Sequence, residues 1–329
     1  MQSVNSRAQT CYVGAASAPA GLVQPRPIDL SEFCNPSNIY QPFKDFCQNG
    51  VVPESEAIRS TIASCCLKYR TPQLLAGLLE NGKVKSLDLS GTFLDARGAQ
   101  DLAILLETNT TLQRICLADN DFETEGIQAI CGALEENSTL VALDLSRNDA
   151  TGPQYVEAIA RMVKTNRTLQ ILELGFSRID AEKLPILVEA LEENQTLTQL
   201  GLGFNSIGPE GICTIIKIAE TKHFIKVLDL SGNKIGPDGG KLIADILKNN
   251  TTLSELDLAY NYLGPDGANA ILNAVRSNLT LRSLSLSYNQ LDGGNAKSIA
   301  ALLVQNTALS ALDFSCNQLF FPAGASGNE

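Results

Sequence analysis

The sequence predicts an α/β fold, a right-handed solenoid (horseshoe) with parallel strands on its concave face and helices on its convex face. The first observation is a frame, L-x-x-L-x-L-x-x-N-x-L, that recurs every 28 residues with a single interval of 29. The second is that apolar spacing within each unit changes from the period of a strand to that of a helix. Such a period indicates units that stack only on their neighbours. The frame begins at Val84, Leu112, Leu140, Leu169, Leu197, Ile225, Leu253, Leu281 and Leu309.

The strand of each unit follows from residues 227–231, Val-Leu-Asp-Leu-Ser. Alternation sends Leu228 and Leu230 to one face and the intervening residues to the other. The leucines are therefore expected inside, and the residues between them are expected to line up in columns on the concave face.

An asparagine closes most of the frames. A carboxamide both donates and accepts hydrogen bonds, which suits a turn buried between neighbouring units. Thr92 and Ser177 replace it in two units, where a hydroxyl is expected to supply part of the same bonding. The asparagines are Asn120, Asn148, Asn205, Asn233, Asn261, Asn289 and Asn317.

A helix follows each turn. Gly236 and Pro237 predict its start, because Gly suits the cap and Pro suits the first helical position. Apolar residues such as Ile243, Ile246 and Leu247 then repeat at helical spacing. The extra residue of the 29-residue interval is expected in a loop near residues 152–153, because Tyr155 then takes the place that glycine holds in earlier units.

Six N-x-S/T sequons fall at one position of the repeat, the end of the helix, so their recurrence is interpreted as structural. Asparagine there is expected to adopt the left-handed conformation, and the following Thr to bond the turn backbone. In a cytoplasmic protein none would be glycosylated. The asparagines are Asn109, Asn137, Asn166, Asn194, Asn250 and Asn278.

The N-terminal part has a different composition. Residues 29–49 are rich in aromatic residues and are expected to fold over the first repeat, with partner binding as the alternative. Helices are predicted over residues 53–70 and 73–80. At the other end, Phe320 and Phe321 are expected to cover the last strand, unless another chain does so. The predicted parts are a disordered or extended arm (1–28), a cap (29–83), a nine-strand array (84–319) and a tail (320–329).

The net charge of −11 is concentrated in the array. Residues 1–83 hold 7 basic and 6 acidic side chains, whereas residues 84–329 hold 18 basic and 30 acidic ones. Nucleic acids and anionic membranes bind through Lys and Arg, so both are disfavoured as partners. A protein with a basic or neutral surface is expected instead.

Nine cysteines without paired spacing indicate reduced thiols in the cytoplasm. The first 28 residues contain Arg7 and Arg26 and no acid, so targeting to an organelle is the alternative. No apolar run is long enough to predict a membrane span.

Two concave columns carry the candidate binding residues. The column between the strand leucines is mostly acidic, and the column two places beyond the second leucine contains four aromatic residues. Exposed aromatic residues beside carboxylates are typical of an interface for a basic partner. The alternative for the acidic column is that Asp in this frame only keeps the edge soluble. The candidate partner-binding residues are Phe176, Phe204, Tyr260, Tyr288, Asp144, Glu173, Asp229 and Asp257.

No catalytic, cofactor or metal site is predicted. The only histidine, His223, has no nucleophile near it in sequence. The closest match to a phosphate-binding loop, residues 239–242, lacks the required Ser or Thr. No cluster of metal ligands is visible.

The run from Asn233 to Leu258 resembles the ribonuclease-inhibitor-type leucine-rich repeats, which also occur in NOD-like receptors and Ran GTPase-activating protein. The resemblance covers residues 84–319 and implies a curved solenoid used as a rigid binding surface. The chain lacks the tryptophans of ribonuclease inhibitor, and no functional residue can be carried over. We expect a non-enzymatic scaffold or adaptor that binds a protein on its concave face. The alternatives are a GTPase-activating protein for a small G protein and a structural subunit of a large ciliary or cytoskeletal assembly.

Overall fold

The computed structural model describes residues 10–11, 28–29, 52–68, 72–80, 82–148, 150–220 and 224–319. The first two segments are strands β1 (Thr10–Cys11) and β2 (Ile28–Asp29), which pair antiparallel. The rest of the predicted arm and the aromatic residues of the predicted cap lie outside the described residues. So do His223 and the predicted cover of Phe320 and Phe321.

Strands and helices alternate through the described repeats. The strands, each three residues long, are β3 (Ser86–Asp88), β4 (Arg114–Cys116), β5 (Ala142–Asp144), β6 (Ile171–Glu173), β7 (Gln199–Gly201), β8 (Val227–Asp229), β9 (Glu255–Asp257), β10 (Ser283–Ser285) and β11 (Ala311–Asp313). The helices are α2 (Glu56–Lys68), α3 (Pro72–Glu80), α4 (Ala96–Thr108), α5 (Glu123–Leu134), α6 (Gln154–Thr165), α7 (Leu184–Glu193), α8 (Gly208–Glu220), α9 (Gly236–Asn249), α10 (Gly264–Val275), the 3-10 turn η2 (Gly293–Asn295) and α11 (Ala296–Gln305).

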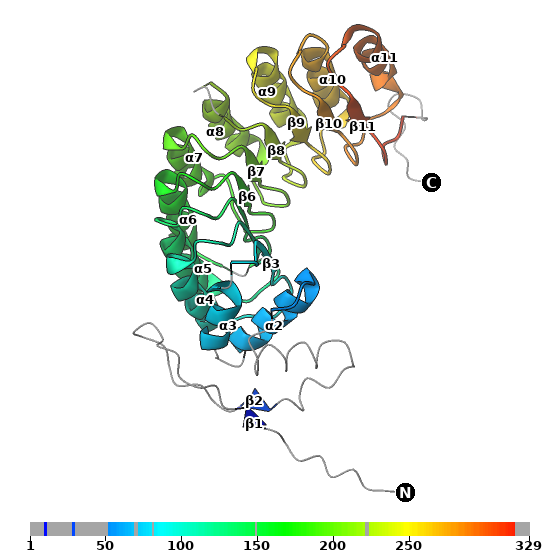
Figure 1. Ribbon diagram of the computed structural model, residues 1–329. Coiled ribbons are helices and arrows are strands. Elements are labelled where there is room, and N and C mark those ends of the chain that lie inside the picture. The colour runs from blue at the N-terminus through cyan, green and yellow to red at the C-terminus, as the bar shows by residue number, and fades with distance from the viewer. Residues whose placement is uncertain are drawn as a thin grey trace, which may run out of the picture.

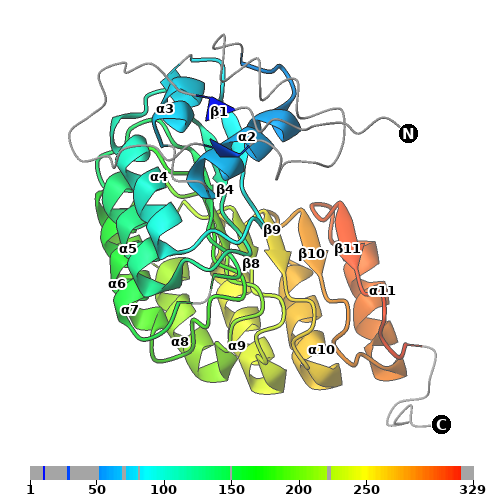
Figure 2. The same ribbon diagram turned by 90° about the horizontal axis from the view of Figure 1, so that it is seen from below.

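The strands form one nine-stranded parallel sheet in chain order, from β3 at one edge to β11 at the other. Figure 1 shows the sheet on the inner side of a curve, with α4 to α11 along the outer side. Figure 2 shows the same helices as a continuous outer row. The predicted solenoid is confirmed.

The apolar core lies between the sheet and the helices. Leu228 pairs with Leu200 and Leu256 on the neighbouring strands, and Leu230 follows it on the same face. Both leucines are buried, as are Ile243 and Leu247 on α9. The units that begin at β3 to β10 repeat this arrangement, so one continuous core runs along them. In the last unit Leu312 and Phe314 are partly buried and pack against the end of this core.

The predicted asparagine ladder joins consecutive repeats. Asn261, fully buried, donates from Nδ2 to the carbonyl oxygens of Leu230, one repeat earlier, at 2.9 Å and of Leu258 at 3.0 Å. Its Oδ1 accepts from the backbone N–H of Asn233 at 2.8 Å. The other six predicted asparagines also donate to a leucine carbonyl of the preceding repeat: Asn120, Asn148, Asn205, Asn233, Asn289 and Asn317.

A second asparagine ladder runs along the helix ends, and here one prediction was wrong. Asn250 has φ −73° and ψ 128°, which is extended and not left-handed. This backbone lets its Oδ1 accept from the N–H groups of Thr252 at 3.0 Å and Leu253 at 2.8 Å. Asn278 Nδ2 donates to Leu247 of the previous repeat at 2.8 Å. The predicted bonding by Thr is confirmed where Thr280 Oγ1 donates to the Asn250 carbonyl oxygen.

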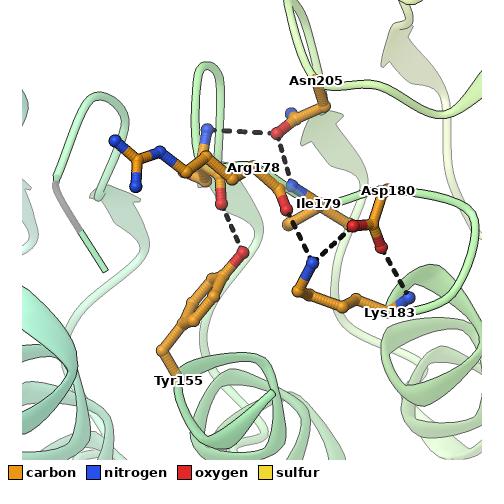
Figure 3. Close-up of polar contacts among 7 residues, drawn as sticks. Tyr155, Arg178, Ile179, Asp180, Lys183 and Asn205 are labelled. Carbon is orange, nitrogen blue, oxygen red and sulfur yellow. Dashed lines mark hydrogen bonds and ion pairs between the residues drawn. The ribbon is translucent and has the colours of Figure 1, made fainter. Parts of the chain in front are cut away.

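The 29-residue interval produces the predicted loop. Residues 149–153 separate Asn148 from α6, whereas only residues 206–207 separate Asn205 from α8. Tyr155 is buried at the start of α6, and its hydroxyl donates to the Ser177 carbonyl oxygen (Figure 3). Burial raises the pKa of Tyr155, which keeps this donor protonated.

Ser177 is one of the two positions that lack the ladder asparagine. Its hydroxyl donates only to Gly175 in its own repeat, at 3.4 Å, while its N–H is bound by Asn205 Oδ1 at 3.0 Å. Figure 3 shows Tyr155 supporting this turn from the side of the preceding helix. The tyrosine hydroxyl therefore supplies a link between repeats where the asparagine is missing.

Helices α2 and α3 precede the first repeat strand. Helix α2 begins three residues after its predicted start at residue 53, and α3 begins one residue before its predicted range. α2 contacts the edge strand β3, where Ser60 Oγ accepts from the Asp88 N–H at 3.0 Å. α2 thus supplies a hydrogen-bond acceptor for a backbone N–H at the edge of the sheet. No helix among the described residues is both long and apolar enough to cross a bilayer.

Candidate functional site on the concave face

One position of every repeat adopts the left-handed backbone conformation, with φ from +53° to +64°. It lies two residues beyond the second strand leucine and faces the concave side. This conformation costs a residue with a side chain about 1 kcal/mol or more, and glycine almost nothing. The position is occupied by Gly91, Asp119, Arg147, Phe176, Phe204, Gly232, Tyr260, Tyr288 and Cys316.

Four bulky aromatic residues at this position form what we call the aromatic ladder: Phe176, Phe204, Tyr260 and Tyr288. The rings of Phe176 and Phe204 stack with centroids 4.6 Å apart, and those of Tyr260 and Tyr288 with centroids 4.0 Å apart. Phe204 and Tyr260 lie 5.7 Å apart and are tilted. The guanidinium of Arg147 lies 3.8 Å from the Phe176 centroid and continues the stack. The ladder is thus one continuous row of rings.

The ladder rings are between 39% and 44% exposed. Two other repeats have glycine at the same position, Gly91 and Gly232, so the fold does not require a ring there. Stacking of an aromatic pair contributes about 0.5 to 1.5 kcal/mol, which offsets the strain in part. Bulky residues in strained conformations concentrate at functional sites, so the ladder is a candidate binding surface.

Gly232 lies in the repeat between Phe204 and Tyr260, and because it has no side chain these two rings can approach each other. A β-carbon at this position would lie 2.5 Å from Cδ1 of Phe204, and the backbone has φ +64°. The bare backbone therefore lets Phe204 lean towards Tyr260.

We expect Gly232→Ala to lower the free energy of unfolding by about 1 to 2 kcal/mol, because the new methyl group meets a ring and the backbone becomes strained. Urea denaturation measures the change. Gly132→Ala on α5 is the control, since no atom lies within 4 Å of its added β-carbon, and it should stabilise by about 0.5 to 1 kcal/mol. Equal effects of the two substitutions would contradict the packing role of Gly232.

The last residue of each strand forms the acidic column. Strand register places these residues side by side on successive strands. They are Asp88, Cys116, Asp144, Glu173, Gly201, Asp229, Asp257, Ser285 and Asp313. The sequence-predicted acids Asp144, Glu173, Asp229 and Asp257 are all part of this column.

The aspartates of the column also have a local structural role. Asp229 Oδ1 accepts from the N–H of Ser231 at 2.7 Å, and Asp144 Oδ1 accepts from Ser146 at 2.9 Å. Asp257 makes the same bond to Ala259. One oxygen of each thus holds the strand end in an Asx turn. This role explains why Asp recurs at this position without requiring a binding partner. The sequence interpretation that Asp only keeps the sheet soluble missed this bond.

Glu173 differs from the aspartates because its longer side chain reaches the next repeat. Its carboxylate fills the space over Gly201 that a β-carbon would occupy, and Gln199 Nε2 donates to Oε1 at 2.8 Å. Burial raises the pKa of Glu173, and the neighbouring Asp144 and Asp229 raise it further. Burial is also the main cause of the raised pKa of Asp257.

We expect Glu173→Gln to be more stable than the wild type at neutral pH. A carboxyl with a raised pKa in the folded state holds its proton more tightly there, so its contribution to stability falls as pH rises through that pKa. Thermal denaturation at about pH 4, where free glutamate is half protonated, and at about pH 7 measures the effect. The difference in melting temperature between the variant and the wild type should increase with pH. A difference that is constant over this range would contradict the electrostatic cause.

The structure brings the eight predicted site residues into two columns on one face. A column of small side chains separates them, for example Ser146, Gly203 and Ser231. Arg147 lies in the same column as the ladder but was not among the predicted binding residues. Sequence reasoning missed Tyr262, which is 57% exposed and left-handed with φ +55°.

The described residues hold no group of three or more His, Cys, Asp or Glu side chains arranged to bind a metal ion. The six cysteines whose side chains the structure describes are free thiols, and burial raises the pKa of Cys116 to about 11. The neighbouring Cys316 and Tyr260 raise the pKa of the Tyr288 hydroxyl.

Comparison with known proteins identifies the repeats. A family model described as "Leucine Rich repeat" matches residues 108–131, 193–214, 221–244, 249–272 and 277–300. Actin-binding site 2 of leiomodin-1 is 20% identical over 56% of this chain and 88% of that chain, with a TM-score of 0.37. The tropomodulin C-terminal domain of Caenorhabditis elegans is 12% identical over 46% of this chain and 92% of that chain, with a TM-score of 0.39. A search of curated proteins gave no match.

Proposed function

Because the chain is a leucine-rich repeat protein, we propose that it is a non-enzymatic scaffold that binds a partner protein on its concave face. The contact surface is the aromatic ladder together with the acidic column. The observation that carries the proposal is that four bulky rings occupy a repeat position where two other repeats have glycine, one of them within the ladder.

The properties of the ladder support binding to a protein. A row of half-exposed rings is an apolar patch, and such patches on a polar surface mark interaction sites. Rigid aromatic side chains lose little conformational entropy on binding and dominate the binding energy of many interfaces. The stacking of Phe176 on Phe204 and of Tyr260 on Tyr288 fixes the rings before a partner arrives.

The chain offers a direct optical test because it contains no tryptophan. Phe204→Trp places a single tryptophan in the ladder, and Asp245→Trp places one on the exposed surface of α9 as the control. A partner is first captured from native extract on the full-length wild-type chain and then titrated onto both variants. We expect the emission of the ladder tryptophan to shift to shorter wavelength while that of the control stays unchanged.

Failure to capture any protein, or a shift only at position 245, would contradict the proposal. Accelerated GTP hydrolysis by a panel of small GTPases in the presence of the chain would contradict its non-enzymatic part.

A further inference from the structure

The orientation of the aromatic rings on the concave surface indicates the class of partner. The ring faces of the aromatic ladder are turned towards one another, with interplanar angles of 4° for Phe176 and Phe204 and 11° for Tyr260 and Tyr288. Arg147 covers the outer face of Phe176. The rings therefore expose mainly their edges, which carry partial positive charge and favour apolar groups and carbonyl oxygens over cations.

The positive charges of a partner must then be bound elsewhere, and the acidic column lies alongside. Among the residues that the structure describes, the ion pairs lie on or next to the helices, and none involves an acid of this column. Asp144, Glu173, Asp229 and Asp257 thus face the concave side without a basic partner. A cationic segment would neutralise these carboxylates, which now repel one another.

The two columns are close enough for one chain segment to reach both. They are three residues apart along each repeat, which is at most about 10 Å, the length of three residues in an extended strand. The column between them consists of small residues, such as Gly175, Gly203 and Ala259. A narrow segment can therefore lie over the small residues, with its backbone and apolar groups against the rings and its basic groups against the carboxylates.

The curvature of the sheet favours an extended segment over a helix. Figure 1 shows that the strands follow the inner side of a curve, and a long straight helix touches such a surface over a few repeats only. Neighbouring strands lie about 4.8 Å apart, so two repeats span about 9.6 Å. Three residues of a polyproline-II segment span about 9.3 Å and return to the same side of that helix. Every third residue would therefore face every second carboxylate position.

We propose that the concave face binds an extended, basic segment of a protein with Arg or Lys at every third position. Two of its basic side chains lie against Glu173 and Asp229, which are two strands apart, with Asp144 and Asp257 on the adjoining strands beside them. Its backbone lies along the aromatic ladder. This inference rests on the proposed function and names the class of partner.

Three fluorescein-labelled twelve-residue peptides test the proposal on the full chain by fluorescence anisotropy. The probe repeats Arg-Pro-Ser four times, one control gathers the same four arginines into a single block, and the other has Glu in place of Arg. The probe should bind about tenfold more tightly than the block peptide, the Glu peptide should not bind, and added salt should weaken binding.

The double variant Asp229→Asn/Asp257→Asn keeps the Asx-turn acceptors and should weaken probe binding about tenfold or more. Asp238→Asn/Asp245→Asn on the exposed surface of α9 is the matched control and should leave it unchanged. The absence of probe binding, or equal binding by the concave variant and the wild type, would overturn the proposal. If a protein captured from extract still shifts the emission of Phe204→Trp, concave binding stands and only the class of partner is wrong.

Discussion

Replacing Asn261 by Ala is expected to lower the free energy of unfolding by about 3 to 5 kcal/mol, because buried backbone groups in two repeats lose their hydrogen-bond partners. The carbonyl oxygens of Leu230 and Leu258 lose a donor, and the N–H of Asn233 loses its acceptor. Asn261 is fully buried, so water cannot replace these bonds without opening the array. Urea denaturation followed by circular dichroism measures the loss.

The exposed Asn273 on α10 provides the matched control for this substitution. Asn273→Ala removes the same atoms from a helix surface, and alanine is the better helix former, so stability should stay equal or rise slightly. A loss below about 1 kcal/mol for Asn261→Ala would mean that the ladder is not what joins the repeats.

The triple variant Phe204→Gly/Tyr260→Gly/Tyr288→Gly is expected to weaken capture of the partner about a hundredfold or more while leaving the melting curve nearly unchanged. Binding falls because three anchoring rings are removed. Stability is preserved because glycine relieves about 1 kcal/mol of left-handed strain at each site, which offsets the stacking that is lost. Capture from native extract and thermal denaturation measure the two quantities.

The control for the triple variant removes exposed apolar side chains from elsewhere on the chain. Leu279, Leu303 and Val304 are at least 63% exposed and lie outside the ladder, so their replacement by Ala should not affect capture. Equal loss in both triple variants would show that general surface hydrophobicity, and not the ladder, holds the partner.

Much of the fold followed from the spacing of residues. The 28-residue frame placed Leu228 and Leu230 inside and put Asp229 beside Asp257, because a fixed period fixes the register of parallel strands. The 29-residue interval also predicted the loop between Asn148 and α6. These predictions needed only periodicity and the hydrogen-bonding capacity of each side chain.

The spacing of residues could not predict backbone conformation or contacts between side chains of different repeats. Asn250 proved extended because its own side chain accepts hydrogen bonds from the turn that follows it. The general preference of asparagine for the left-handed conformation does not account for such a local bond. The reach of Glu173 over Gly201 depends on a missing β-carbon one repeat away. The ladder was predicted as a row, yet its strained backbone and the exposure of ring edges emerged only from the three-dimensional arrangement.

Photo-crosslinking from the ladder tests concave binding most directly. A photoreactive phenylalanine analogue replaces Phe176 in one full-length chain and the exposed Asp245 of α9 in another, and each is irradiated with the captured partner. We predict crosslinks from position 176, with the linked peptides of the partner identified by mass spectrometry, and none from position 245. Crosslinks from position 245 with none from position 176 would place the partner on the helices and contradict binding on the concave face.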